Sequence, residues 1–453
     1  MPDALATCPG QLSAAQDRAF DRHARRLGHD PRLLRDGTEL VSYPTMASVA
    51  ALRALSAATP RQRRRRQAVF FGPSIAIRAS IGQGVHDRLE AAAFADGQAS
   101  PLDEGQAARH FPFPTRIVSV RRREVGPGDS WDLSVRGEHW GLDDRDDILS
   151  VVNVGCLRLA PGATVLVQGN LLILIVQRLI CDAGIGAGPC QLAVLPTPFP
   201  VDGGTGPLDG TSGPAGQDGT AGADGVAAPT TLTWLGARLM SPVVPGACDG
   251  SDGGNAASGG AGVRARTGGA SKFAEITIGD LTGALTVVAM AGRGGDGGDG
   301  GHGGDGGHGG HGAPAQRTVQ GTVPAGSGGS GGHGGDGGPG GRGGSGGISS
   351  NIFVSLPPGQ EGQLRVLSQP APGGRGGRGG LAGTGGNPGQ GGPGTNGEPG
   401  RALASGARGH AGADGASGRA GRTRPAPPAF VNERPVTPVP TAAQVQQQEE
   451  MRQ

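Results

Sequence analysis

Two stretches between residues 292 and 347 repeat the pair Gly-Gly at every third position, and this repeat constrains the fold more than any other part of the chain. A three-residue period fits neither an α-helix nor a β-strand. It is the period of the polyproline II helix, which has about three residues per turn and no internal hydrogen bonds. The repeat therefore predicts rods in which each sequence phase forms one ridge.

Glycine fills two of the three phases, and the third phase of the first tract is polar, with Asp296, Asp299 and His302 as its first members. Bare ridges let neighbouring backbones come close, so that N–H and C=O groups left free by the helix bond between rods. We predict that the polar ridge faces water and that glycines form the contacts between rods. The predicted rod-packing residues are Gly294, Gly295, Gly297, Gly298, Gly300, Gly301, Gly328, Gly329, Gly331 and Gly332.

Two other structures are compatible with a glycine repeat. A collagen triple helix needs glycine at only one position in three and is usually rich in proline elsewhere, whereas residues 292–312 contain no proline. A disordered glycine linker is the second alternative. The doubled glycine phase favours a folded bundle of polyproline II rods over both.

The composition limits how such a chain is stabilised and what it binds. Among 453 residues there are 92 glycines and 36 prolines, and aromatic residues make up 3%, so small residues and backbone pairing must supply the stability. A net charge of +2 gives no general attraction to nucleic acids or acidic membranes. No secretory signal peptide is visible, and the longest strongly apolar run, 171–176, is far shorter than the roughly 20 residues of a membrane span. We expect a soluble protein.

Short apolar runs between residues 157 and 175 alternate with the turns Pro161-Gly162 and Gly169-Asn170. Such spacing is typical of a β-solenoid or a β-sandwich, and the segment resembles a coil of right-handed parallel β-helices. After residue 200, apolar segments alternate with glycine tracts, which predicts one apolar spine that each tract leaves and re-enters. The predicted fold class is mainly β with polyproline II: a β-solenoid or β-sandwich spine, glycine-rich rods and a small α/β N-terminal region.

The predicted organisation has four parts. Residues 1–114 form a mixed helical region, 115–202 a β-rich, solenoid-like domain, 203–423 alternating strands and rods, and 424–453 a tail rich in Pro and Gln. Helices are expected at 13–27 and 48–57. The arginine cluster at 61–66 is expected to be a solvated turn, and Leu232 and Trp234 are assigned to a strand of the spine.

Five cysteines are present, and Cys181 and Cys190 bracket a glycine-rich loop. A disulfide that closes this loop and a pair of buried free thiols are the two alternatives that the sequence leaves open.

No catalytic, cofactor or metal site is predicted. Successive Asp and His residues of one ridge lie about 9 Å apart, whereas metal ligands lie about 2–2.5 Å from the cation, so one rod cannot chelate an ion. The run from Gly373 to Arg378 is similar to RNA-binding RGG segments but is short and lacks an aromatic residue. The glycine tracts offer no packed pocket and no nucleophile elbow, so an enzyme is not expected.

The Gly-Gly-X and Gly-X-Y tracts of residues 203–421 resemble the glycine-rich polyproline II bundles of some phage tail-fibre adhesins and of springtail antifreeze proteins, and their repeat is collagen-like. The chain differs from those adhesins in showing no aromatic residues at the predicted rod ends. It differs from the antifreeze proteins in carrying Asp and His on the exposed ridge.

Two functions are compatible with this organisation. The first is a non-enzymatic structural protein that self-associates, through its rods, into an extracellular or surface fibre or filament. The alternative is an adhesin or receptor-binding tip, in which loops at the rod ends bind a cell-surface target. Both favour a location outside the cell or on its surface, with the cytoplasm or a virion as the alternative, and neither involves nucleic acid or a membrane span.

Overall fold

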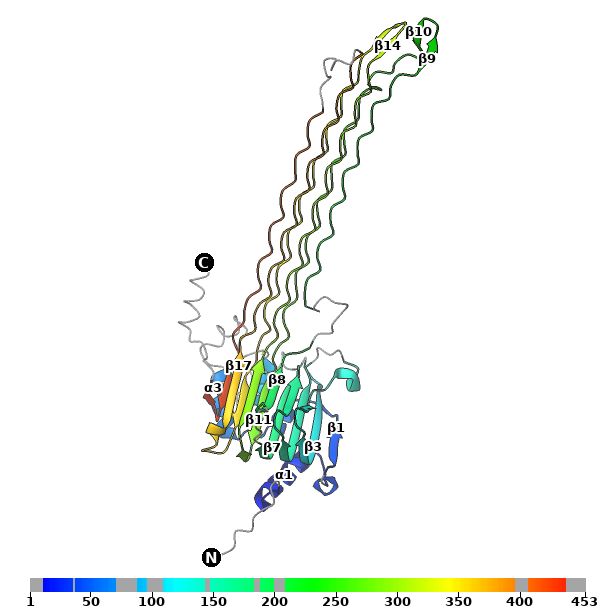
Figure 1. Cartoon of the computed structure of the whole chain (residues 1–453). Helices are drawn as coiled ribbons and strands as arrows, with labels where there is room; N and C mark the ends of the chain where they lie inside the picture. Colours follow the sequence, from blue (N-terminus) through cyan, green and yellow to red (C-terminus); the bar gives the residue numbers. More distant parts are fainter. Residues whose placement is uncertain are drawn as a thin grey trace, which may run out of the picture.

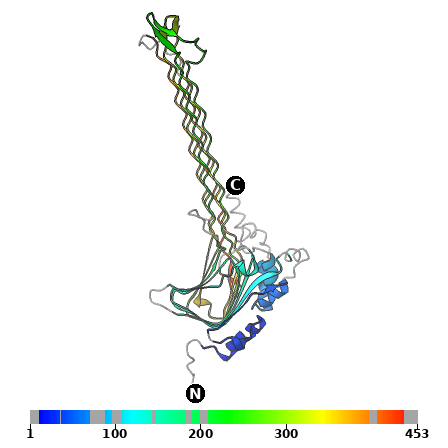
Figure 2. The same cartoon turned by 90° about the vertical axis from the view of Figure 1, so that its right-hand side faces the viewer.

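The computed structural model describes residues 11–35, 37–70, 88–95, 108, 110–142, 147–182, 188–198, 208–395 and 406–436. The chain forms a base of β-sheets and helices, from which a long stalk of extended segments projects. Small hairpins lie at the far end of the stalk (Figures 1 and 2). The stalk therefore separates two structured regions of the molecule.

The larger sheet of the base has ten strands in the order β1-β3-β5-β7-β11-β16-β18-β19, with β12 beside β7 and β2 beside β3. Its central strands run parallel, and antiparallel pairs occur only toward the two edges. The strands are β1 (Glu39–Ser42), β2 (Thr45–Met46), β3 (Phe113–Val125), β5 (Leu149–Leu159), β7 (Leu171–Cys181), β11 (Ala274–Ile278), β12 (Leu281–Thr282), β16 (Ile352–Ser355), β18 (Ala429–Val431) and β19 (Arg434–Pro435).

The smaller sheet has five parallel strands in the order β17-β13-β8-β6-β4. They are β4 (Ser130–Asp132), β6 (Thr164–Gln168), β8 (Cys190–Leu195), β13 (Leu285–Met290) and β17 (Leu364–Gln369). Residues of both sheets form one buried core, in which Leu174, Ile276 and Val287 have no exposed surface. Strands from residues 115–202 and from 203–423 share both sheets, and residues 429–431 of the predicted tail form β18.

Helices cover the other face of the larger sheet. The longer helices are α1 (Ala14–Arg26), α2 (Val49–Leu55), α3 (Pro60–Phe70) and α5 (Arg88–Phe94); the 3-10 turns are η1 (Pro31–Leu33), η2 (Gly137–Trp140) and η3 (Glu361–Gln363). The predicted helices at 13–27 and 48–57 are confirmed as α1 and α2, and a capping box between Ser13 and Gln16 begins α1. Phe94 of α5 stacks on Phe273 with ring centroids 4.3 Å apart, so large side chains fill this second core.

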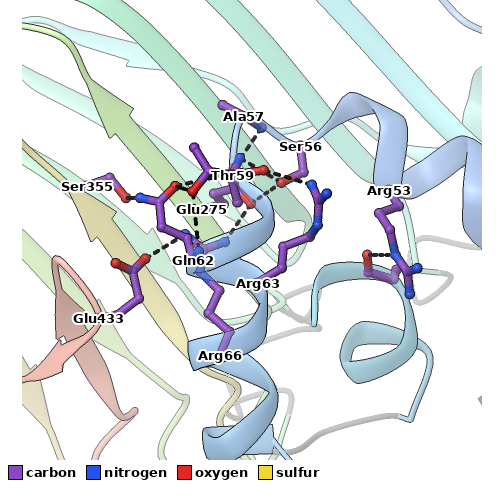
Figure 3. A network of polar contacts seen from close by, with 12 residues as sticks. Arg53, Ser56, Ala57, Thr59, Gln62, Arg63, Arg66, Glu275, Ser355 and Glu433 are labelled. Atoms are coloured by element: carbon purple, nitrogen blue, oxygen red, sulfur yellow. Dashed lines mark hydrogen bonds and ion pairs between the residues drawn. The ribbon is translucent and has the colours of Figure 1, made fainter. Parts of the chain in front are cut away.

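A buried ion pair fixes α3 to the larger sheet (Figure 3). Arg66 Nη1 of α3 lies 2.8 Å from Glu275 Oε2 of β11, and both side chains have no exposed surface. Glu275 also accepts hydrogen bonds from the Ser56 hydroxyl at 2.7 Å and from the Ala57 N–H at 2.9 Å. The expectation that the arginine cluster at 61–66 is a solvated turn was therefore wrong, because these residues are helical and Arg66 is buried.

The predicted fold class was also wrong. The base is a mixed α/β fold with a large, mostly parallel sheet and few helices, and not a β-solenoid or β-sandwich spine. The strand alternation was read correctly, but almost every residue of β7 is buried, on both faces of its sheet. A strand buried on both faces needs a layer on each side, and helices supply one of them.

Candidate binding tip and its stalk

Six extended glycine-rich segments make the stalk, and we call them rods 1 to 6: residues 208–226, 248–269, 292–315, 326–347, 372–393 and 406–424. Rods 1, 3 and 5 lead from the base toward the tip, and rods 2, 4 and 6 lead back. Backbone hydrogen bonds between rods recur at every third residue. The N–H groups of Gly294, Gly297 and Gly300 in rod 3, for example, donate to every third carbonyl of rod 5, at 2.8–2.9 Å.

The ten predicted rod-packing glycines all lie in rods 3 and 4. A Cβ added at any of them would lie 1.9–2.1 Å from a carbonyl oxygen of a neighbouring rod, too close for any side chain. The neighbour alternates with phase: a Cβ on Gly300 would meet Gly338 of rod 4, and one on Gly301 would meet Pro214 of rod 1. Each of the two glycine ridges therefore contacts a different neighbour.

The number of glycine phases follows the number of neighbours. Rod 3 is hydrogen-bonded to rods 1, 2, 4 and 5, and rod 4 to rods 2, 3, 5 and 6. Rods 1 and 6 lie at the edges of the bundle, bond to two rods each, and have a regular glycine in one phase only. One chain thus supplies every rod of the described stalk.

The polar third ridge has a role that the sequence did not reveal. Its side chains are exposed, as predicted, but they also accept backbone N–H groups of the next rod. Asp299 Oδ1 accepts from the Arg378 N–H at 2.7 Å, and His302 Nδ1 accepts from the Leu381 N–H at 2.9 Å. These bonds satisfy N–H groups that the glycine contacts leave free, so Asp and His add lateral links to the stalk.

Hydrogen bonds of the same kind lower the pKa of two other carboxyls on this ridge. The N–H of Arg375, helped by the Arg293 guanidinium, holds the pKa of Asp296 below its ordinary value. The N–H and the hydroxyl of Thr384, 2.7 and 2.8 Å from Asp305 Oδ1, lower the pKa of Asp305. Both carboxylates are thus stabilised in the charged form that the bundle uses.

Two hairpins form the tip beyond the rods. Strands β9 (Thr230–Thr233) and β10 (Gly236–Leu239) form the first, and β14 (Gln316–Thr318) and β15 (Gly321–Val323) form the second. Their turns repeat one design: the hydroxyls of Thr233 and Thr318 donate to the carbonyls of Gly236 and Gly321 at 2.7 Å. Both glycines have a positive φ, +124° and +131°, which side-chain-bearing residues rarely adopt.

The two hairpins are joined to each other. The N–H of Val319 donates to the carbonyl of Ala237 at 2.8 Å, and the N–H of Leu239 donates to Gln320 Oε1 at 3.0 Å. The hairpin turns are therefore held as one unit at the end of the stalk (Figure 1).

Large apolar side chains are exposed on these hairpins and in the segments that join the first hairpin to the rods. Trp234 is 91% exposed and Leu232 is 88% exposed. Eight of the fifteen large hydrophobic residues that are exposed in the described chain lie in the tip or, for Val226, at the adjoining end of rod 1: Val226, Leu232, Trp234, Leu235, Met240, Val243, Val244 and Val319. We call these eight residues the tip patch.

The full charges on the two described hairpins have one sign. Residues 226–248 contain a single charged residue, Arg238, and residues 313–335 contain only Arg317 besides one histidine. Both arginines are exposed, and each belongs to one hairpin. The nearest carboxylates along the chain, Asp224 and Asp249, accept N–H groups of His311 and Ser327 at the ends of the rods.

The structure corrects the assignment of Leu232 and Trp234 to the spine. These residues are in the tip, so an aromatic residue does stand at a rod end, contrary to the sequence-based expectation. Alternating apolar residues look alike in a buried strand and in an exposed hairpin. The sequence does contain one signal that separates the two cases. Each hairpin is separated along the sequence from the sheet strands before and after it by one full glycine tract.

The structure has free thiols at this loop and no disulfide. Cys181 and Cys190 are both buried, and the Cys190 thiol donates to the carbonyls of Leu159 and Ala160 at 3.4 Å. Burial, and then the neighbouring Cys190, raise the pKa of the Cys181 thiol, which keeps it protonated and unreactive.

Comparisons of the chain with protein-family models, with curated proteins and with solved structures give no significant match. Among the residues that the structure describes, no group of three or more His, Cys, Asp or Glu side chains is placed to hold a metal ion. None of the described helices has the length and hydrophobicity needed to cross a membrane.

Proposed function

We propose that the protein is a non-enzymatic, stalked binding protein of the adhesin or receptor-binding type, working outside the cell or on its surface. The observation that carries the proposal is the tip patch at the end of the stalk farthest from the base. Large apolar side chains are concentrated at this end, and a concentration of exposed apolar surface marks sites of interaction because leaving it in water is unfavourable.

The stalk supports this function by its construction. Its rods bond to one another at every third residue, and rods 3 and 4 are each hydrogen-bonded to four other rods. Such a bundle resists bending better than a single extended chain, so it holds the tip away from the base. Rods 2 to 6 continue directly into or out of strands of the base, which has two buried cores.

A fibre subunit is the second candidate. Rods 1 and 6 bond to two rods each, which leaves one side of each edge rod open to a rod of another copy. The central rods, however, find their partners within one chain, so the stalk needs no second copy to form.

Binding of the fluorescently labelled full chain to a panel of intact cells, measured by flow cytometry, tests the proposal. We expect binding to be lost when Trp234 and Leu232 are both replaced by Ser, and retained in Leu381→Ser, which alters an exposed apolar residue on rod 5 instead. Equal binding by the two variants would contradict a binding role for the tip. Regular filaments in electron micrographs of the purified chain, unaffected by the tip substitutions, would favour the fibre instead.

A further inference from the structure

We infer that the target of the tip is the surface of a negatively charged lipid bilayer, which the tip patch enters to the depth of the headgroups. The inference rests on the proposed function, because it names the partner of the same tip.

The shape and chemistry of the tip patch fit a bilayer interface. Trp234 and Leu235 occupy the turn between β9 and β10, and Leu232 lies beside them on β9. These side chains project from a hairpin, and an exposed fraction of 91% for Trp234 means that almost nothing in the chain covers the ring. Tryptophan favours the membrane–water interface, where its ring lies among apolar groups and its N–H stays hydrated.

The charge of the tip fits an anionic surface. Arg238 and Arg317 are the only residues of the two hairpins with a full charge, and both are exposed. Cations beside an apolar insertion add attraction to acidic lipids, and the long arginine stem lets the guanidinium stay at the headgroups while neighbouring side chains go deeper. Asp224 and Asp249 would repel such a surface, but they lie at the rod ends and not on the hairpins.

Many backbone N–H and C=O groups of the two hairpins are hydrogen-bonded within the tip, which lowers the cost of moving them into a less polar environment. All four residues of β9 pair with β10, the second hairpin pairs over three residues, and a further bond joins Val319 to Ala237. Backbone groups that are already bonded lose less when water around them is replaced by lipid headgroups. An isolated exposed loop with the same side chains would lack this property.

Co-sedimentation of the full chain with phosphatidylcholine vesicles, with and without phosphatidylserine, tests the inference. We expect binding to vesicles that contain phosphatidylserine, weakened by salt. Trp234→Ser and Leu232→Ser should each weaken binding on the order of tenfold, whereas the stalk control Leu381→Ser should bind like the unmodified chain. The double variant Arg238→Gln with Arg317→Gln should lose the preference for phosphatidylserine.

Quenching by brominated lipids supplies an independent readout of insertion. The chain has three tryptophans. Trp131 is buried in the base, Trp140 belongs to η2, and Trp234 is in the tip. We expect quenching in the unmodified chain and its loss in Trp234→Ser, because only Trp234 is at the tip. Quenching that persists in Trp234→Ser would overturn the inference.

The outcomes separate this inference from the proposed function. Binding to intact cells through the tip, without binding to vesicles made from the lipids of those cells, would overturn the lipid target and leave the binding tip in place, with a protein or glycan as its partner. If the chain associates with itself without vesicles, and Trp234→Ser abolishes that association, the lipid target would be overturned in favour of contact between two copies of the chain. Failure to bind both cells and vesicles would overturn both proposals.

Discussion

The substitution Gly301→Ala tests the packing of the rods most directly. A Cβ at this position would lie 1.9 Å from the carbonyl oxygen of Pro214 in rod 1. Carbon and oxygen atoms in contact are about 3.3–3.6 Å apart, so rods 1 and 3 would have to separate locally by more than about 1 Å. A carbonyl oxygen in a bonded backbone cannot rotate away as a side chain can.

The expected loss of stability follows from the bonds at this level of the stalk. The Gly301 N–H donates to the Gly260 carbonyl at 2.9 Å, and the Gly301 carbonyl accepts from the Gly338 N–H at 2.8 Å. Overpacking costs about 1–3 kcal/mol, and each weakened hydrogen bond costs about 0.5–1.5 kcal/mol. We expect Gly301→Ala to lower the free energy of unfolding of the stalk by about 2–6 kcal/mol.

Thermal unfolding of Gly300→Ala, Gly301→Ala and Leu381→Ala measures the effect. A Cβ on Gly300 would also lie 1.9 Å from a carbonyl oxygen, that of Gly338, so both glycine phases should be sensitive. Leu381 is 62% exposed on rod 5 and serves as the control, with little expected change. A collagen-like triple helix would be sensitive only in the phase of Gly300. Melting of Gly301→Ala at the temperature of the Leu381→Ala control would refute the packing described above.

Three further outcomes are expected. Arg66→Ala should lower the free energy of unfolding by about 3–5 kcal/mol, because it leaves the buried Glu275 carboxylate without an opposite charge. Replacement of the exposed Arg64 by Ala, measured by the same denaturant titration, should change this free energy by less than about 0.5 kcal/mol. Equal losses in the two variants would contradict the role of the ion pair. The stalk should lose stability in acid, because Asp296 and Asp305 have a lower pKa in the folded chain than the ordinary value of about 3.9. The two carboxylates contribute their full stabilisation above about pH 3.9, and this stabilisation is lost as the pH falls through their lowered pKa in the folded chain. Melting curves between pH 7 and pH 2 check this, and in Asp305→Ala the loss in acid should be smaller. Deletion of residues 273–288, which removes β11, β12 and part of β13, should make rods 2 and 3 sensitive to limited proteolysis; rods that stay as resistant as in the full chain would show that they do not depend on the sheets.

The sequence predicts contacts that depend on a local period better than contacts that depend on distant partners. The phases of Gly300 and Gly301 repeat within three residues, so a close approach of other chains could be inferred before any neighbour was known. The acceptor role of Asp299 could not, because its donor, the N–H of Arg378, lies 79 residues away.

The base and the tip were harder to predict for the same reason. Arg66 and Glu275 are 209 residues apart, and the sequence around Arg66 does not indicate that its side chain pairs with a buried carboxylate. The apolar residues of β9 and β11 show similar local patterns, yet Ile276 is fully buried and Leu232 is exposed. Only the position of each segment relative to the six rods separates a core strand from a tip hairpin.

The three-residue phase of the rods determines how the length of the stalk can change during evolution. An insertion of one or two residues would turn the ridges of a rod and press side chains against neighbouring carbonyls. A whole triplet keeps the ridges in place and moves the end of that rod outward by about 9 Å. Because whole three-residue units preserve the contacts between rods, the reach of the stalk can change in fixed increments while the sheets remain unaltered. The hairpins lie beyond the last increment, and their sequence is free to diversify independently of the reach.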